Sequence, residues 1–153
     1  MASLIPFIHE ILPMIMPSAT RITRAKQLEP AHPTVEGPVI HREAIVNKCD
    51  KMCASVLTTR PKATSTIRHN SEQDAIVYAV SGNGILTVNQ GLGMELKDHE
   101  LSPGDFAFIP AWTEHQVRNE TEEDVVWLMI QSGPHPIGAD LADWGGDMVT
   151  VRN

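Results

Sequence analysis

The chain has 153 residues, a hydrophobic content of 42% and a formal net charge of −7 at pH 7. This length is typical of one domain with a sizeable buried core, and the acidic balance argues against a nucleic acid or an anionic membrane surface as partner. We expect Cys49 and Cys53 to be free thiols in a reducing compartment, because four residues of strand span about 13 Å, which is too far for a disulfide. A cytoplasmic location is therefore expected.

An N-terminal extension, residues 1–16, is apolar but interrupted by two prolines, His9 and Glu10. It lacks the basic start and the unbroken apolar core of a signal peptide, and it is too short to cross a membrane as a helix. Its isoleucines recur at roughly helical spacing, so three interpretations stay open: a helix that covers a partner subunit, a loosely ordered arm and a membrane-surface anchor. Because such a segment would not stay exposed on a monomer, we expect a homodimer.

Residues 17–35 form an extended, proline-rich entry segment, with one helical turn expected at 23–28. Short β-branched and alternating runs between glycine and proline turns then predict strands at 40–46, 51–59, 64–68, 75–80, 85–89, 94–101, 106–109, from His115 onward and at 124–131. The last strand is the most apolar and is expected to cross the centre of the fold. Short strands at this regular spacing favour an antiparallel barrel or sandwich, followed by a tail over residues 136–153.

One motif extends from the turn before the strand expected at 106–109 into the strand that begins at His115. Gly104, Pro110, His115 and Asn119 give the pattern G-x5-P-x4-H-x3-N, which resembles the second signature motif of the cupin superfamily. The resemblance implies that the glycine makes a turn, the proline ends a strand and His115 points into a small barrel as a metal ligand. The chain departs from the motif at Trp112, where the family usually has glycine.

The first cupin motif, H-x-H-x(3,4)-E-x6-G, is only partly present. Counting back from Gly82 places Ala75 where the family has glutamate. With the three-residue spacer the first histidine falls on His69, and with the four-residue spacer the pair falls on Arg68 and Asn70. The surrounding frame resembles the small single-domain cupins of fungal secondary-metabolite clusters. The implied fold is all-β, an antiparallel cupin barrel (a jelly roll or double-stranded β-helix) over residues 36–135, preceded by the short extension.

The candidate site follows from strand alternation and from the two motifs. Alternation places Gln73 and Val77 on the face that the cupin pattern turns inward, and His69 shares that register if the three-residue spacing holds. His69, Gln73 and His115 are then a candidate ligand set for one divalent ion, zinc, iron, copper, nickel or manganese. A metal-free site is the alternative, in which His115 and His69 are the catalytic residues and His115 is a general acid or base.

The predicted function is that of a small-molecule enzyme of secondary metabolism acting on a cyclic or polyketide-like substrate in the barrel. Its chemistry would be metal-assisted oxygenation, or acid/base isomerisation, cyclisation or decarboxylation. Gln73, Val77, Trp112 and Trp127 are the expected substrate-binding residues, with a core position as the alternative for the two tryptophans. The remaining histidines are expected on the surface or in turns: His9, His32, His41, His99 and His135. A non-catalytic binding protein with a degenerate metal site is the alternative function.

Overall fold

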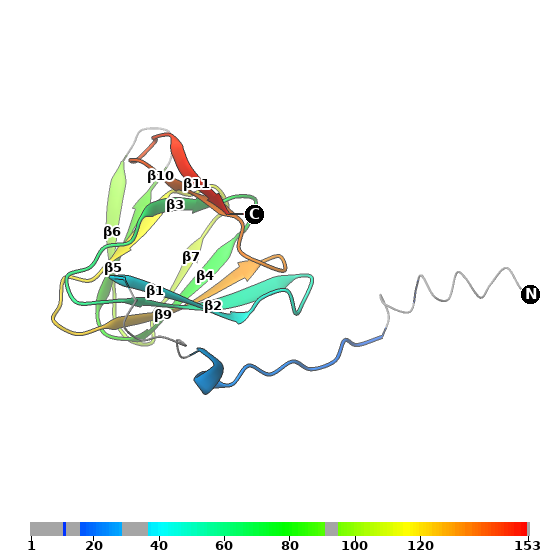
Figure 1. The fold of residues 1–153 in the computed structure, drawn as a ribbon. Helices are drawn as coiled ribbons and strands as arrows, with labels where there is room; N and C mark the ends of the chain where they lie inside the picture. The colour runs from blue at the N-terminus through cyan, green and yellow to red at the C-terminus, as the bar shows by residue number, and fades with distance from the viewer. Residues whose placement is uncertain (1–10, 12–15, 29–36, 91–94, 153) are drawn as a thin grey trace, which may run out of the picture.

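A computed structural model describes residues 11, 16–28, 37–90 and 95–152 of the chain (Figure 1). The three interpretations of residues 1–16 therefore fall almost wholly outside the described residues. Within the described ranges, one short 3-10 helix, η2 (Ala25–Leu28), lies in the entry segment, as expected. No helix of the described part is long and apolar enough to cross a membrane.

Eleven strands in the described part form two antiparallel sheets that face each other as a barrel (Figure 1). The strands are β1 (Val39–Ile45), β2 (Met52–Thr59), β3 (Ile67–Asn70), β4 (Ala75–Ser81), β5 (Gly84–Asn89), β6 (Leu96–Leu101), β7 (Phe106–Ile109), β8 (His115–Arg118), β9 (Val125–Ser132), β10 (Gly138–Leu141) and β11 (Met148–Arg152). One sheet has the order β1-β2-β9-β4-β7, and the other has the order β11-β10-β3-β8-β5-β6. The predicted all-β antiparallel barrel is confirmed.

The hydrophobic core fills the space between the two sheets and is centred on β9. This strand lies in the middle of the five-stranded sheet, and its alternate residues Val125, Trp127 and Met129 point inward and are buried. Trp127 is fully buried, and its Nε1 donates a hydrogen bond of 2.9 Å to the hydroxyl of Thr59. Val77 on β4 is 1% exposed and belongs to the same cluster.

Gly84 provides the space into which the Trp127 indole packs. A Cβ at this position would lie 2.2 Å from Cζ2 of Trp127 and 2.9 Å from Cγ1 of Val125. Because Trp127 has no free space to move into, we expect Gly84→Ala to lower the free energy of unfolding by about 1–3 kcal/mol in urea titrations. Gly37→Ala is the matched control, since a Cβ at Gly37 meets nothing within 4 Å. Equal unfolding midpoints for the two variants would contradict this packing.

The C-terminal residues differ from the expectation of a tail outside the barrel. Residues 138–141 form β10, which pairs with β3 from Gly138↔Asn70 to Leu141↔Ile67, and β11 pairs with β10. The sequence did not predict β10 because G-A-D-L is short and shows no alternation. The barrel therefore extends past residue 135, and one of its walls comes from the end of the chain.

Candidate functional site in the barrel

A cavity of about 280 Å³ lies inside the barrel, between β1 and β2 on one side and β3, β8 and β10 on the other. It is lined by Pro38, Val39, His41, Leu57, Thr64, Ser65, Thr66, Arg68, His115, Val117, Met129, Gln131 and Asp140. Its apolar residues come mainly from β2, β8 and β9, whereas its charged residues come from β3 and β10. This volume is at the lower end of the range for small-molecule sites.

His115 is the first residue of β8 and lines this cavity. The side chain is 3% exposed, and its Nδ1 lies 2.9 Å from the carbonyl oxygen of Thr113. A carbonyl oxygen only accepts hydrogen bonds, so Nδ1 must carry the proton of the neutral ring. Nε2 is then a bare acceptor, and it is buried without a hydrogen-bond partner.

The charge state of His115 follows from its surroundings. Its pKa is lowered from 6.5 to about 4, mainly by burial; the hydrogen bond to Thr113 opposes this, and electrostatic repulsion by Arg68 and His69 adds smaller decreases. The ring is therefore neutral at pH 7, with a lone pair on Nε2. An anionic ligand placed beside it would raise this pKa, because negative charge stabilises the imidazolium.

Arg68 stands directly beside His115, on the neighbouring strand. The register pairs Arg68 with His115 on one side and with Asp140 on the other, so the three side chains share the inner face of the six-stranded sheet. A Cβ at Gly138 would lie 2.7 Å from Nη2 of Arg68, which shows that the guanidinium lies against β10. Asp140 is 8% exposed, and its Oδ1 accepts a hydrogen bond of 3.2 Å from Thr66. The cavity thus combines one guanidinium, one carboxylate and two imidazoles, those of His115 and His41.

His69 follows Arg68 on β3, so its side chain lies on the other face of the sheet. There its ring lies 5.2 Å from that of Trp112, centroid to centroid, and Trp112 is 57% exposed. Trp112 has φ +67, a left-handed backbone that glycine adopts without strain. This explains why glycine suits the position in the cupin motif. The observed register corresponds to the four-residue spacing, with Arg68 and Asn70 at the two histidine positions.

Gln73 is buried, but its amide is used to fix a neighbouring loop. Its Oε1 accepts hydrogen bonds of 2.8 Å from the backbone of Ile137 and 3.1 Å from Gln131, and its Nε2 donates one of 2.8 Å to the carbonyl of His135. Among the described residues, neither Gln73 nor His69 lines the cavity. The structure therefore does not bring His69, Gln73 and His115 together as a ligand set.

The other residues expected at the site, or expected outside it, can be placed in the same way. In the described part of the chain, Val77, Trp112 and Trp127 are absent from the cavity lining: the first and last lie in the core, and Trp112 lies on the outside. His41 corrects the expectation of a surface histidine, because it pairs with Leu57 and lines the cavity. The alternation of inward and outward residues along β1 was the signal that could have placed His41 in the cavity. Asp140 had no comparable signal, because it lies on a strand that the sequence did not predict.

The residues of this cavity do not fit a divalent metal ion. His41, His115 and Asp140 line it, but Arg68 contributes a positive charge among them, and Ala75 stands where the cupin motif has a carboxylate. In the described ranges, no three or more histidine, cysteine, aspartate or glutamate residues lie together as a metal site. The donor set is that of a site for a polar or anionic organic molecule.

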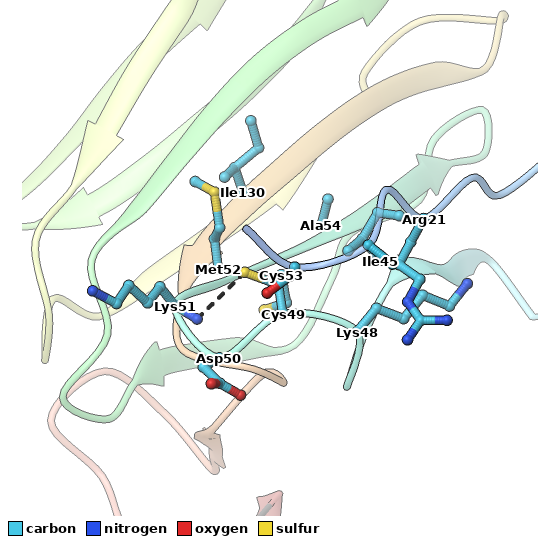
Figure 2. Close-up of a pocket in the computed structure, with 12 residues that line it drawn as sticks. Arg21, Ile45, Lys48, Cys49, Asp50, Lys51, Met52, Cys53, Ala54 and Ile130 are labelled. Atoms are coloured by element: carbon cyan, nitrogen blue, oxygen red, sulfur yellow. Dashed lines mark hydrogen bonds between the residues drawn. The ribbon is translucent and has the colours of Figure 1, made fainter. Parts of the chain in front are cut away.

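A larger hollow of about 620 Å³ lies outside the barrel, where the entry segment passes the ends of β1 and β2 (Figure 2). Its charged residues Arg21, Lys48, Asp50 and Lys51 are all exposed. Cys53 is its buried residue, and desolvation raises the pKa of this thiol. Because water solvates the charges of this outer groove, we assign the chemistry to the smaller barrel cavity.

The comparisons with known proteins agree with this architecture. A barrel of two antiparallel sheets with a polar cavity between them is an architecture that occurs among proteins that bind small molecules. Residues 55–131, from β2 to β9, match the Cupin domain family. The chain therefore belongs to the cupin family. Comparison with curated protein sequences finds no significant match.

Similar solved structures show the same fold at low sequence identity. Oxalate decarboxylase from Bacillus subtilis is 19% identical with a TM-score of 0.66, over 75% of this chain and 31% of that one. KdgF from Halomonas sp. is 19% identical with a TM-score of 0.60, over 75% of this chain and 94% of that one. TT1209 from Thermus thermophilus is 21% identical with a TM-score of 0.58, over 74% of this chain and 98% of that one. The chain thus spans about a third of the length of the decarboxylase.

Proposed function

We propose that this cupin is a metal-independent enzyme that binds a small acidic molecule in the barrel cavity and moves a proton through His115. The observations that carry the proposal are that His115 and Arg68 both line this cavity and that Nε2 of His115 is buried without a hydrogen-bond partner. A buried acceptor without a partner costs about 1–3 kcal/mol unless a ligand or water satisfies it. A proton on a bound substrate would satisfy it.

The residues suggest proton transfer next to a carbonyl group. Nε2 of His115 would take a proton from the carbon beside the carbonyl, and the electron pair of that C–H bond would move onto the carbonyl oxygen as an enolate. Arg68 would stabilise this oxyanion. In a β,γ-unsaturated carbonyl compound this enolate is conjugated with the C=C bond, and return of the same proton from the imidazolium to the γ-carbon completes an isomerisation, so atoms and electrons balance without an oxidant. In a cyclisation the enolate carbon would attack a second carbonyl of the substrate, and the proton held by His115 would neutralise the new alkoxide. Decarboxylation of a β-keto acid would instead break the C–C bond to the carboxylate, release CO2 and leave an enolate that Arg68 would stabilise until carbon is protonated.

The size of the cavity limits the substrate. A volume of about 280 Å³ suits a molecule with one ring or a short chain, and Leu57, Val117 and Met129 give it apolar walls. This is consistent with a cyclic or polyketide-like acid of secondary metabolism, which is the substrate class that we propose. Metal-assisted oxygenation is not part of the proposal, because the donor set does not fit a metal.

A non-catalytic binding protein is the second candidate, and one observation favours it. A pKa of about 4 makes His115 a weak base at neutral pH. Unless the bound anion raises this pKa, the ring would accept a hydrogen bond from a ligand without taking its proton. Turnover of a bound acid separates the two candidates.

A thermal-shift screen tests the proposal. Small keto acids and cyclic carboxylic acids at about 100 times their dissociation constant should stabilise the protein by about 2.7 kcal/mol, which raises Tm by several degrees. Their amides or esters should have little effect. Arg68→Met should abolish the shift, whereas Arg24→Met, which removes an exposed guanidinium from the entry segment, should retain it. Equal shifts with acids and amides, or in Arg68→Met, would refute an acid site.

A further inference from the structure

We infer that Gln131 determines specificity in the barrel cavity, because its Oε1 accepts a hydrogen bond from a hydroxyl group of the ligand. The inference deepens the proposed function and rests on it for the acid group. The substrate would then be a hydroxylated acid, with a phenolic or enolic hydroxyl in addition to the carboxylate bound by Arg68. Gln131 belongs to β9, is 5% exposed and lines the cavity, so a molecule that fills the cavity contacts this side chain.

The orientation of the Gln131 amide is set by a chain of hydrogen bonds that begins at the backbone. The N–H group of Ile137 can only donate, and it donates to Oε1 of Gln73 over 2.8 Å. The carbonyl oxygen of His135 can only accept, and Nε2 of Gln73 donates to it over 2.8 Å. Oε1 of Gln73 lies 3.1 Å from the Gln131 amide, so Gln131 must present its Nε2 there as the donor.

This orientation turns the oxygen of the Gln131 amide away from Gln73. Among the described residues, none donates a hydrogen bond to Oε1 of Gln131. Its neighbour on β4 is Ala75, which has only a methyl group. The hydroxyl of Thr66, also in the cavity wall, donates to Asp140 over 3.2 Å. The hydrogen-bond donor that this buried oxygen requires must therefore come from a bound molecule or from water.

The cavity thus has one group for an anion and separate groups for hydrogen-bond donors. Arg68 would bind the carboxylate, as proposed above. Oε1 of Gln131 would accept the hydrogen bond of a hydroxyl group, and the carboxylate of Asp140 is a further acceptor in the lining. A hydroxylated acid with one ring or a short chain satisfies both kinds of group. An acid without a hydroxyl would leave the Gln131 oxygen buried and unpaired.

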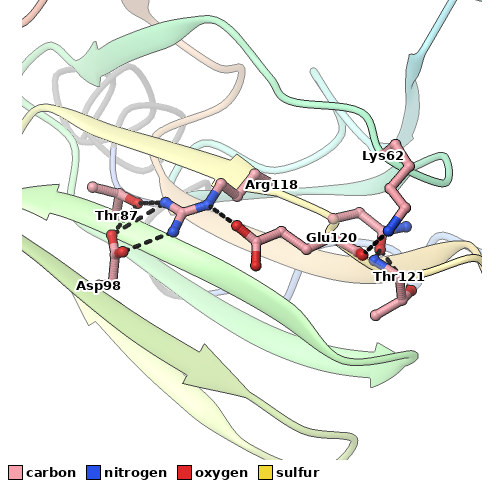
Figure 3. Close-up of polar contacts among 7 residues, drawn as sticks. Lys62, Thr87, Asp98, Arg118, Glu120 and Thr121 are labelled. Atoms are coloured by element: carbon pink, nitrogen blue, oxygen red, sulfur yellow. Dashed lines mark hydrogen bonds and ion pairs between the residues drawn. The ribbon is translucent and has the colours of Figure 1, made fainter.

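A second polar cluster of the barrel differs in this respect. On the outer face of the six-stranded sheet Arg118 forms an ion pair of 2.7 Å with Asp98 and another of 3.1 Å with Glu120 (Figure 3). Its Nη1 donates a hydrogen bond of 2.6 Å to the hydroxyl of Thr87, which in turn donates one of 2.6 Å to Asp98. These groups satisfy one another within the protein, so this cluster offers no comparable group for a ligand.

Binding of simple aromatic acids tests the inference. Calorimetry would compare benzoate with the three monohydroxybenzoates and their methyl ethers, which are molecules of one ring. At least one hydroxybenzoate should bind about 10- to 100-fold more tightly than benzoate and than its own methyl ether, because loss of the hydroxyl leaves Oε1 of Gln131 without a donor. In Gln131→Met this preference should disappear, while benzoate keeps its affinity through Arg68.

The matched control is Gln116→Met. Gln116 follows His115 on β8, but its side chain lies on the outer face, where its Nε2 donates a hydrogen bond of 3.0 Å to the backbone carbonyl of Ser65. Both variants therefore lose one amide hydrogen bond through the same substitution, but Gln116→Met should keep the wild-type preference. Unchanged circular dichroism spectra establish that folded proteins are compared.

Variants of Gln73 test the orientation of the Gln131 amide. Gln73→Glu keeps an acceptor oxygen for Ile137 and Gln131, so it should keep the preference for the hydroxybenzoate. Gln73→Met removes this acceptor, so the Gln131 amide can turn over and the preference should fall. A purely structural role of Gln73 would instead change stability and leave the preference at the wild-type value.

Two results would overturn the inference. One is a set of hydroxybenzoates that bind no more tightly than benzoate, and the other is a preference that persists unchanged in Gln131→Met. Failure of the proposed acid site has a different result, since acids and their amides would then bind equally. Phenol and anisole repeat the comparison without a carboxylate, and a preference for phenol that depends on Gln131 would support hydroxyl recognition even then. Absence of binding by all of these compounds would overturn both proposals.

Discussion

Replacing His115 with alanine should reduce turnover of any substrate found in the acid screen by about 10²- to 10⁴-fold. This is the expected cost of losing a general acid or base, and His115 lines the cavity with an Nε2 that is buried without a hydrogen-bond partner. Binding of the acid should weaken much less, because Arg68 still supplies the positive charge. Steady-state rates, together with dissociation constants from calorimetry, separate the two effects.

His99→Ala is the matched control, because His99 lies on β6 and, like the rest of that strand, does not line the barrel cavity. Its turnover should equal that of the wild type. Metal analysis of both proteins adds a second readout, since loss of activity with unchanged metal content favours proton transfer over metal ligation by His115. Wild-type rates in His115→Ala would reject proton transfer by His115 and would assign the turnover to other residues of the protein.

The free energy of unfolding should decrease as the pH falls from 6.5 to 4. The pKa of His115 is about 4 in the folded protein, against 6.5 for the ordinary side chain, mainly because of burial. Between these two values the unfolded chain binds the proton more readily than the folded chain does, so acid favours unfolding. A pKa shift of this size corresponds to roughly 3 kcal/mol of unfolding free energy, and this contribution is lost almost completely by pH 4.

Urea titrations of the wild type and His115→Gln at pH 7 and pH 4.5 measure this effect. The variant has no imidazole at this position, so its unfolding free energy should decrease less between the two pH values. The carboxyl of Asp98 does not interfere, because its hydrogen bonds with Arg118 and Thr87 lower its pKa to about 2, below the window. Identical pH dependence in the two proteins would mean that folding does not lower the pKa of His115.

The order of the strands could be predicted because local signals define them. Gly104 and Gly82 have positive φ values, and both were assigned to turns from sequence. The nine strands expected between residues 40 and 131 are all present, with ends that differ by a few residues. Strand β10 was not predicted, because G-A-D-L forms a strand through its pairing with β3 and β11, and no local pattern encodes those partners.

The site was harder to predict than the fold, because it depends on register. A shift of one residue in β3 exchanges His69 for Arg68 on the inner face, and the motif allowed both spacings. The pairing of Arg68 with His115 decides between them. Gln73 was correctly expected to point inward, but its hydrogen bonds to the loop at 135–137 depend on contacts distant in sequence.

Part of the cavity wall lies outside the segment that matches the family. The family match covers residues 55–131, but Val39 and His41 on β1 and Asp140 on β10 lie outside it. Exchanging these two strands would alter the shape and charge of the binding cavity while Trp127 and its neighbours remain packed. Some of the residues that shape the cavity can therefore be changed apart from the segment that holds most of the core. A protein engineer could graft new specificities onto this barrel through β1 and β10 alone, and an expression fragment cut at the family boundaries would lose both.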